Sequence, residues 1–197
     1  MKIVGIGDST TAGTPGFSSP LESPPTGSGN PESQYAYWMT QLHPEWTVLN
    51  RGVNGEDSGE IMARFPRDVL GERPDVVVIL AGVNDVYRGR SAAAVRSNLS
   101  TMYSRAQAAG IRVVAGSILP YNSMSRRQSE MLHELTLWIE TIAQDSGILY
   151  CDTHAFAGDP QNPNRLSGSP DGLHPDVDGY RRMGEGLVRA IESLTQR

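Results

Sequence analysis

Residues 75–85 read DVVVILAGVND, and this stretch decides the fold. From Val76 to Leu80 the chain holds five successive apolar residues, without the alternation of polar and apolar side chains that a half-exposed strand shows. Such a run is typical of a strand that is buried on both faces, as the strands of a parallel sheet are. We therefore expect a parallel sheet with helices on both of its faces.

The rest of the chain repeats this pattern, because short β-branched runs alternate with segments of helical character. The expected strands cover residues 2–6, 47–50, 75–81, 112–117 and 148–151, and the expected helices cover residues 33–42, 57–70, 91–109, 125–146 and 178–194. This alternation predicts right-handed crossovers and one α/β domain over residues 1–197. Ligands of such sheets bind outside the carboxyl ends of the strands.

The composition fits an ordinary globular domain and excludes several classes of protein. Hydrophobic residues make up 38% of the 197 residues, and charged residues make up 20%. The net charge of -5 argues against a nucleic-acid partner. No apolar run approaches the roughly 18 residues that a bilayer span requires, so no membrane span is expected. Cys151 is the only cysteine, which excludes an internal disulfide and a CxxC metal site.

The start of the chain indicates its compartment. Lys2 leads directly into strand-forming residues, with no basic segment followed by an apolar one. A cytoplasmic protein is therefore expected, although a secreted protein whose signal peptide had been removed would show the same start. The sequence does not indicate an oligomeric state.

Two long segments rich in proline, glycine and serine interrupt the pattern, at residues 13–32 and 155–172. Connections of this length within a compact domain are usually either functional or disordered. The first segment closely follows Ser9, so it is either a disordered surface loop or a wall or lid on the substrate side. Both interpretations remain open at the level of sequence.

The expected strand ends carry complementary catalytic groups. Ser9 offers a hydroxyl, His174 an imidazole, and Asp171 a carboxylate that a tight turn can bring to that imidazole. Asn84 offers a side-chain amide and Gly55 an unobstructed backbone N–H. A hydroxyl nucleophile, a base, an orienting carboxylate and oxyanion donors are the parts that acyl transfer requires. Asp8 and Asp85 compete with Asp171 for the orienting role, but each is more easily explained as stabilising its own loop.

Four short blocks carry a family resemblance: GDST at 7–10, NRGVNG at 50–55, GVND at 82–85 and DGLHPD at 171–176. In this order they resemble the SGNH (GDSL-like) hydrolases, although no leucine follows the serine of the first block. The resemblance implies a flavodoxin-like three-layer α/β/α sandwich with a five-stranded parallel sheet. It also implies that Ser9 is the nucleophile of a triad with Asp171 and His174. Ser9, Gly55 and Asn84 would form the oxyanion hole.

The resemblance further implies an esterase that works without a metal or organic cofactor. Family members hydrolyse esters and thioesters and deacetylate sugars, so the expected substrate is a small-molecule or carbohydrate ester with a short acyl or acetyl group. Apolar and aromatic residues of the expected crevice loops are candidate substrate contacts: Phe17, Tyr87, Tyr121, Phe156 and Leu166. Activity is expected to fall on acidification, when the imidazole of His174 becomes protonated.

Two alternatives from other classes use the same loops. The stretch GIGDSTTAGT could be a phosphate or flavin loop of a doubly wound sheet, although Thr10 stands where the third glycine of a dinucleotide fingerprint belongs. That interpretation leaves Asn84, Asp171 and His174 without a role. The other alternative is a carbohydrate-binding module without catalytic activity.

Overall fold

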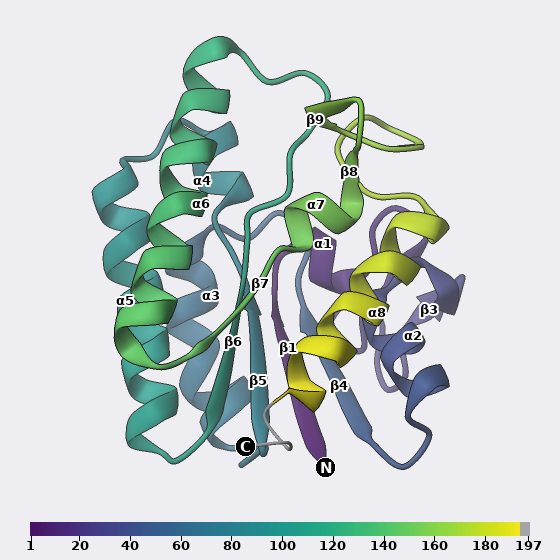
Figure 1. The fold of residues 1–197 in the computed structure, drawn as a ribbon. Helices are drawn as coiled ribbons and strands as arrows, with labels where there is room; N and C mark the ends of the chain where they lie inside the picture. The colour runs from purple at the N-terminus through teal and green to yellow at the C-terminus, as the bar shows by residue number, and fades with distance from the viewer. Residues whose placement is uncertain (194–197) are drawn as a thin grey trace.

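A five-stranded parallel sheet lies between two layers of helices in the computed structural model, which describes residues 1–193 (Figure 1). The strand order is β4-β1-β5-β6-β7, and every pair of neighbours is parallel. This confirms the predicted flavodoxin-like α/β architecture. The strands are β1 (Lys2–Gly7), β4 (Thr47–Gly52), β5 (Val76–Leu80), β6 (Arg112–Gly116) and β7 (Leu149–Cys151).

The apolar run of β5 is buried on both faces, as its composition predicts. Val77 and Ile79 pack into the core under α3 (Ser58–Phe65), α5 (Ala92–Ala108) and α6 (Arg126–Ser146). Val76 and Val78 pack on the other face, under α2 (Tyr35–Leu42) and α8 (Val177–Glu192). Each such side chain contributes about 1.5–3 kcal/mol when it is fully removed from water, so both helical layers are held by the same strand.

The helix ends follow the capping signals, with one difference from the expected ranges. The side chain of Asp57 caps α3 and that of Ser125 caps α6, each in a reciprocal capping box. The helix expected over 57–70 is divided, because α3 ends at Phe65 and a π-helical turn η2 (Pro66–Leu70) follows. Pro66 lacks the N–H that would continue the α-helical hydrogen bonds. The expected end of the last helix at residue 194 lies outside the described residues.

Short elements that the sequence pattern does not predict lie in the loops. They are the helices α1 (Ser9–Ala12), α4 (Val83–Tyr87) and α7 (Thr153–Ala157), the 3-10 turn η1 (Pro31–Ser33), and two small antiparallel pairs, β2 (Phe17–Ser18) with β3 (Ser28–Gly29) and β8 (Gly158–Asp159) with β9 (Asn162–Leu166). Each is too short for a periodic pattern to be visible. The 13–32 segment is therefore folded, and the interpretation as a disordered loop is wrong.

The strand order places the end of β1 at a topological switch point. The chain leaves β1 for β4 on one side and later returns to β5 on the other, which opens a crevice at the carboxyl end of β1. In Figure 1 the short helix α1 stands at this end of β1. Within residues 1–193 no helix is both long enough and apolar enough to cross a bilayer.

Candidate active site

Ser9, His174 and Asp171 form a continuous chain of hydrogen bonds at the carboxyl edge of the sheet. The Ser9 hydroxyl donates to His174 Nε2 at 2.9 Å, and His174 Nδ1–H donates to Asp171 Oδ2 at 2.6 Å. Because a carboxylate can only accept, it fixes the imidazole proton on Nδ1 and leaves Nε2 as the acceptor for the serine. These three residues are the ones that the sequence predicts to meet, and 165 positions separate Ser9 from His174.

The loop that carries His174, residues 169–174, is held largely by its own groups. Asp171 Oδ1 accepts the backbone N–H groups of Leu173 and His174, each at 2.9 Å. Ser169 Oγ donates to the carbonyl of His174 at 2.6 Å and accepts the N–H of Gly172 at 2.9 Å. Burial alone would raise the pKa of Asp171, but the hydrogen bonds from His174 and from the Leu173 N–H outweigh it and hold the pKa below its usual value. The carboxylate therefore stays ionised beside the imidazole.

Ser9 begins helix α1 at a place where the backbone is closely packed. The side chain of Asp8 caps the helix, accepting the Thr10 N–H at 2.9 Å and the Thr10 hydroxyl at 2.8 Å. A Cβ atom at Gly7 would clash with the carbonyl of Leu80 and the hydroxyl of Thr11, so only glycine allows α1 to lie this close to the sheet.

The other two candidate carboxylates are occupied elsewhere. Burial raises the pKa of Asp8 to about 6, although the hydrogen bonds from Thr10 partly oppose this. Asp85 accepts the backbone N–H and the hydroxyl of Ser58, each at 2.8 Å, and burial raises its pKa as well. Neither carboxylate is hydrogen-bonded to the imidazole of His174, so of the three candidates only Asp171 contacts it.

The turn at residues 52–57 carries the predicted oxyanion donor Gly55, which has a φ of +80°. Among residues 1–193, no group accepts the backbone N–H of Gly55 or of Ser9. Asn84 Nδ2 donates one N–H to the carbonyl of Glu56 at 2.9 Å, which leaves its second N–H free. Asn54, Asn84 and Ser9 line the cleft, whereas Gly55 is not among the lining residues.

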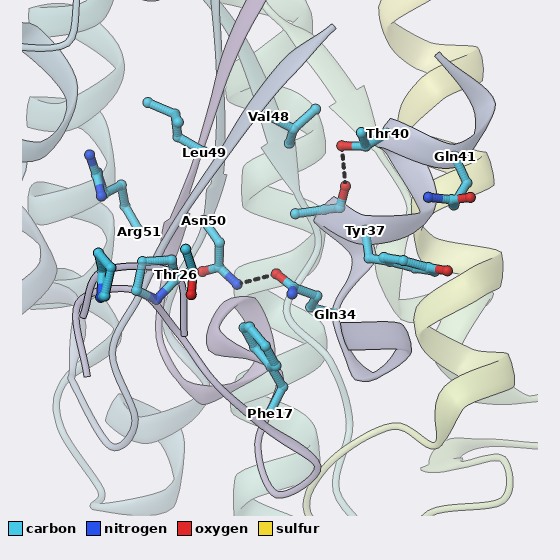
Figure 2. Close-up of a pocket in the computed structure, with 13 residues that line it drawn as sticks. Phe17, Thr26, Gln34, Tyr37, Thr40, Gln41, Val48, Leu49, Asn50 and Arg51 are labelled. Atoms are coloured by element: carbon cyan, nitrogen blue, oxygen red, sulfur yellow. Dashed lines mark hydrogen bonds between the residues drawn. The ribbon is translucent and has the colours of Figure 1, made fainter. Parts of the chain in front are cut away.

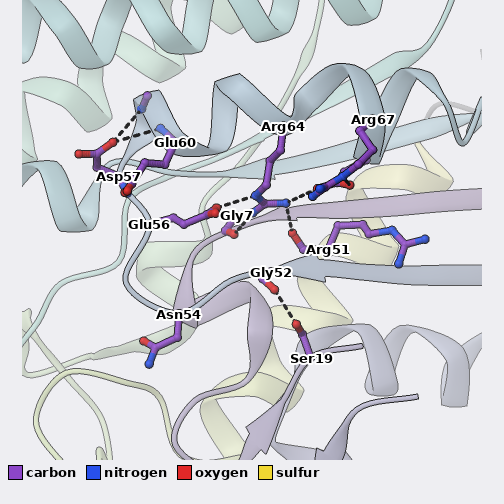
Figure 3. Close-up of polar contacts among 12 residues, drawn as sticks. Gly7, Ser19, Arg51, Gly52, Asn54, Glu56, Asp57, Glu60, Arg64 and Arg67 are labelled. Atoms are coloured by element: carbon purple, nitrogen blue, oxygen red, sulfur yellow. Dashed lines mark hydrogen bonds and ion pairs between the residues drawn. The ribbon is translucent and has the colours of Figure 1, made fainter. Parts of the chain in front are cut away.

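One buried arginine joins this turn to β1, the strand that precedes Ser9 (Figure 3). The side chain of Arg64 is 8% exposed, and its guanidinium donates to the carbonyl of Gly7 at 2.8 Å and to that of Arg51 at 2.7 Å. It also forms ion pairs with Glu56 at 2.6 Å and with Asp68 at 3.0 Å. The ends of β1 and β4, which precede Ser9 and Gly55, are therefore joined by a single side chain.

The 13–32 segment also holds the 52–57 turn. Ser19 Oγ donates to the carbonyl of Gly52 at 2.6 Å, a contact that is visible in Figure 3. The two carboxylate oxygens of Glu22 accept the N–H of Asn54 at 2.8 Å and that of Ser19 at 3.0 Å. This long segment is thus a support for the turn beside the cleft.

The cleft next to Ser9 is small and partly aromatic. Its volume is about 170 Å³, and it is lined by Ser9, Thr10, Asn54, Val83, Asn84, Tyr87, Tyr121, Leu173 and His174. The rings of Tyr87 and Tyr121 meet edge to face, with their centroids 5.7 Å apart. Tyr121 is buried, and its hydroxyl has no hydrogen-bond partner within residues 1–193. Because this oxygen is itself buried, Tyr121 contributes the surface of its ring, rather than its hydroxyl, to the cleft.

Tyr87 and Tyr121 therefore lie where the sequence predicts substrate contacts, but three other candidates do not. Phe17 is buried and lines a different pocket. Phe156 packs on α8, with the guanidinium of Arg189 5.5 Å from the centre of its ring. Leu166 is buried in the core beneath α8. The structure does not bring these three residues to the cleft, because apolar loop residues close to the crevice along the chain turn inward to bury their surface.

Several residues of the site escape sequence reasoning. Arg64, Ser19 and Glu22 lie on surface-like polar stretches that give no signal of their contacts with the turn. The side chain of Asn50 donates to the carbonyl of Ala12 at 3.1 Å and accepts the N–H of Gly52 at 2.9 Å, and its place inside one of the four sequence blocks is the only signal of these contacts. Burial raises the pKa of the Cys151 thiol to about 12, which keeps it protonated. Among residues 1–193 no group of three or more histidine, cysteine or acidic side chains could hold a metal ion.

Comparison with known proteins assigns the chain to a protein family. The sequence profile of the GDSL-like lipase/acylhydrolase family matches residues 6–182. The chain belongs to this family. The predicted relationship is thereby confirmed, and the protein is an ester hydrolase of the GDSL type. The interpretations as a phosphate or flavin protein or as a binding module without activity are not retained.

Individual relatives agree with this assignment. An arylesterase of Vibrio mimicus is 30% identical over 190 residues, which cover 96% of this chain and 88% of the relative. An acetylxylan esterase of Geobacillus stearothermophilus is 27% identical over 171 residues, which cover 78% of this chain and 76% of the relative. The solved structure of a G-D-S-L family protein from Desulfitobacterium hafniense DCB-2 superposes with a TM-score of 0.80 at 25% identity, and covers 96% of this chain and 98% of that one.

Proposed function

We propose that the protein hydrolyses carboxylic esters of short acyl groups through an acyl-enzyme on Ser9. The observation that carries this proposal is the chain of hydrogen bonds from Asp171 through His174 to the Ser9 hydroxyl, at 2.6 Å and 2.9 Å. This arrangement gives the serine a base with its acceptor nitrogen already directed at the hydroxyl. It is the geometry that activates an otherwise weak alcohol nucleophile.

The reaction then runs in two steps. In the first, His174 Nε2 takes the proton of Ser9 while Oγ attacks the ester carbonyl, and the resulting imidazolium protonates the departing alcohol. In the second, water attacks the acyl-enzyme, His174 again takes and returns one proton, and the carboxylic acid leaves. Asp171 stays ionised throughout and stabilises the imidazolium.

The oxyanion of each tetrahedral intermediate is held by three donors. They are the N–H groups of Ser9 and Gly55 and the second N–H of the Asn84 amide. Their lack of protein acceptors supports this role, because it leaves each N–H able to donate to an oxyanion. Loss of one such donor typically lowers turnover by about 10²–10³-fold.

The size of the cleft favours a small acyl or alcohol group. Its volume of about 170 Å³ is below the roughly 300–1,000 Å³ of pockets that take drug-sized ligands. The aromatic pair of Tyr87 and Tyr121 gives it an apolar wall. Such a cleft suits an acetyl ester of an aryl or sugar alcohol. The arylesterase and acetylxylan esterase relatives act on groups of this kind.

A series of p-nitrophenyl esters from acetyl to decanoyl tests the proposal, with the wild-type protein measured beside Ser9→Ala. We expect the highest kcat/KM with the shortest acyl groups and no turnover by the variant. A fluorophosphonate that labels the wild type at Ser9 but not Ser9→Ala would support the nucleophile independently of the substrate. Turnover by Ser9→Ala at the wild-type rate would overturn the mechanism, and an optimum at decanoyl would overturn the short-chain assignment.

A further inference from the structure

A second pocket, separate from the catalytic cleft, lies at the outer edge of β4 (Figure 2). Its volume is about 400 Å³, more than twice that of the cleft, and the two share no lining residue. The 13–32 segment forms one wall, α2 forms another, and strand β4 forms the floor. We call it the β4-edge pocket; it is lined by Phe17, Pro20, Pro25, Thr26, Gln34, Ala36, Tyr37, Thr40, Gln41, Val48, Leu49, Asn50 and Arg51.

The floor of the β4-edge pocket presents unpaired backbone groups. Thr47 and Val53 direct their N–H groups to β1, where they bond to the carbonyls of Met1 and Gly7. Because alternate residues of a strand face opposite edges, Val48 and Asn50 direct their N–H and C=O groups away from β1. Within residues 1–193 these groups have no hydrogen-bond partner. They are donors and acceptors that a ligand in the pocket can reach.

Gln34 adds a fixed donor to this floor. It is only 8% exposed, and its Oε1 accepts the Asn50 amide at 2.7 Å, as Figure 2 shows near the centre of the pocket. That bond fixes the orientation of the Gln34 amide. Its Nε2 then has two N–H groups and no partner among the described residues. A side chain this buried, held by one end and unpaired at the other, is suited to a hydrogen-bond acceptor from outside the protein.

The shape of the floor excludes an added peptide strand. Only Val48 and Asn50 are open, because the next outward-facing residue, Gly52, already bonds to Ser19 through its carbonyl and to the Asn50 side chain through its N–H. Two open positions on alternate residues span about 7 Å, whereas a paired strand usually needs five or six residues. A compact ligand fits this floor better than an extended one.

The lining favours a neutral ligand over a strongly charged one. Arg51 is the only charged residue among those that line the β4-edge pocket, and its guanidinium is paired with Glu72 at 2.6 Å. The remaining polar groups are amides and hydroxyls, from Gln34, Gln41, Thr26 and Thr40. The ligand should therefore be neutral and rich in groups that both donate and accept hydrogen bonds.

We propose that the β4-edge pocket binds a neutral carbohydrate of one to three sugar units. Sugar hydroxyls match the amides, hydroxyls and open backbone groups of the floor, and the partly exposed side chain of Tyr37 offers a surface for the apolar face of a sugar ring. The site is distinct from the cleft that binds the reacting ester. It does not depend on the proposed hydrolysis, because binding at this pocket uses neither Ser9 nor His174.

Titration calorimetry with xylotriose, cellotriose and maltotriose tests this proposal on the Ser9→Ala protein, so that hydrolysis plays no part. We expect saturable binding of at least one saccharide, weakened tenfold or more by Tyr37→Ala and by Gln34→Glu. The second variant keeps the oxygen that Asn50 contacts and removes the free amide nitrogen. Gln144→Ala, an exposed glutamine on α6, is the matched control and should bind as the parent does.

Three results would overturn the proposal. The first is the absence of saturable binding for all three saccharides. The second is binding that survives Tyr37→Ala but is lost in Tyr87→Ala, which would place the sugar in the catalytic cleft. The third is binding of trialanine as tight as that of the best saccharide, which would indicate a peptide site. Thermal unfolding of each variant establishes that it is folded, and Gln41→Ala on the exposed rim replaces Gln34→Glu if that variant does not fold.

Discussion

The two sides of the catalytic cleft are built in different ways. The 169–174 loop holds His174 largely through local contacts, since Asp171 and Ser169 bond to backbone groups no more than five residues away. The 52–57 turn is held from a distance, by Arg64 of α3, Arg88 beyond α4, and the 13–32 segment. The first is a local sequence motif, and the second is a product of the tertiary fold.

Because of this difference, changes in the 169–174 loop should mainly affect activity, and changes in the contacts of the 52–57 turn should mainly affect stability. A change within the 169–174 loop should remove activity and leave the fold nearly intact, because few distant groups depend on it. A change in the contacts of the 52–57 turn should lower the free energy of unfolding, because the same contacts join β1, β4 and α3. The four predictions below test that separation, from the largest expected effect to the smallest.

Replacement of Asp171 by Asn should have the largest effect on activity. An amide keeps the oxygen that accepts the Leu173 and His174 N–H groups, but it no longer fixes the imidazole proton on Nδ1. We expect kcat to fall about 10³–10⁴-fold with little change in the free energy of unfolding. Steady-state kinetics and urea denaturation measure the two quantities. Asp145→Asn, on the exposed face of α6, is the control. A fall in the free energy of unfolding of Asp171→Asn that the control does not show would contradict the local character of the loop.

Replacement of Arg64 by Met should affect stability most. It removes a guanidinium that is 8% exposed, so the carboxylate of Glu56 loses its donor and the carbonyls of Gly7 and Arg51 each lose one hydrogen bond. Removing one partner from a buried ion pair typically costs about 3–5 kcal/mol. Urea denaturation should show a loss of this order in the free energy of unfolding.

Arg67→Met is the matched control for Arg64→Met. Arg67 pairs with the same Asp68, but its side chain is 71% exposed, so the variant should lose less than about 1 kcal/mol. If the two variants lost equal stability, the connection between β1 and β4 through Arg64 would not be the source of the stability lost in Arg64→Met. The kcat of Arg64→Met should also fall, since the 52–57 turn loses its link to β1.

Asp8 directly precedes Ser9, and the burial of its carboxyl group makes the free energy of unfolding depend on pH. The pKa is raised to about 6 in the folded protein, against about 3.9 in an unfolded chain. Between these values the unfolded chain ionises while the folded protein keeps its proton, so stability from this group falls as pH rises and is lowest above about pH 6. A shift of this size corresponds to roughly 2–3 kcal/mol.

The Asp8→Asn variant should therefore be more stable than the wild type at pH 8 by up to about 2–3 kcal/mol, and equal to it near pH 4. Asparagine keeps an oxygen for the Thr10 N–H and hydroxyl. Urea denaturation at both pH values measures the difference, with Asp145→Asn as the control. A stability difference that does not change between pH 4 and pH 8 would show that burial of Asp8 is not its source.

The smallest effect is expected for Glu22→Gln. Glu22 is exposed, and its two oxygens accept the N–H groups of Asn54 and Ser19; the amide retains only one acceptor oxygen. Loss of one such bond is worth about 1 kcal/mol, which predicts a fall in kcat of about fivefold with KM nearly unchanged. Glu32→Gln, in the same segment but without contact to the turn, should behave as the wild type. A change confined to KM would argue that Glu22 contacts substrate rather than positions the turn.

The local character of one region also explains how much of the molecule could be predicted. The run of Val76–Leu80 predicts a strand buried on both faces, and DGLHPD at 171–176 predicts the carboxylate and the base. Both can be predicted because each pattern consists of a few consecutive residues and does not depend on distant contacts. The ends of the five central strands agree with the structure to within two residues. Helix α1, by contrast, has four residues, and no periodicity can be read from so short an element.

What could not be predicted depends on contacts between distant residues. Nothing in the sequence near Arg64 indicates that its guanidinium reaches the carbonyl of Gly7, 57 positions away. Phe17, Phe156 and Leu166 resemble cleft residues by their place in the chain, yet side-chain direction in an irregular loop is decided by packing. The Gln34 amide is similar, because its bond to Asn50 exists only once α2 lies beside the edge of β4.

The direction of β1 has a practical consequence for attaching this enzyme to a surface. Met1 lies at the amino edge of the sheet, where its carbonyl bonds to Thr47, and the cleft lies at the carboxyl edge (Figure 1). The six residues of β1 between them span about 20 Å. A tether fused before Met1 would therefore leave the cleft facing the solution, so an immobilised catalyst should keep free access to its ester.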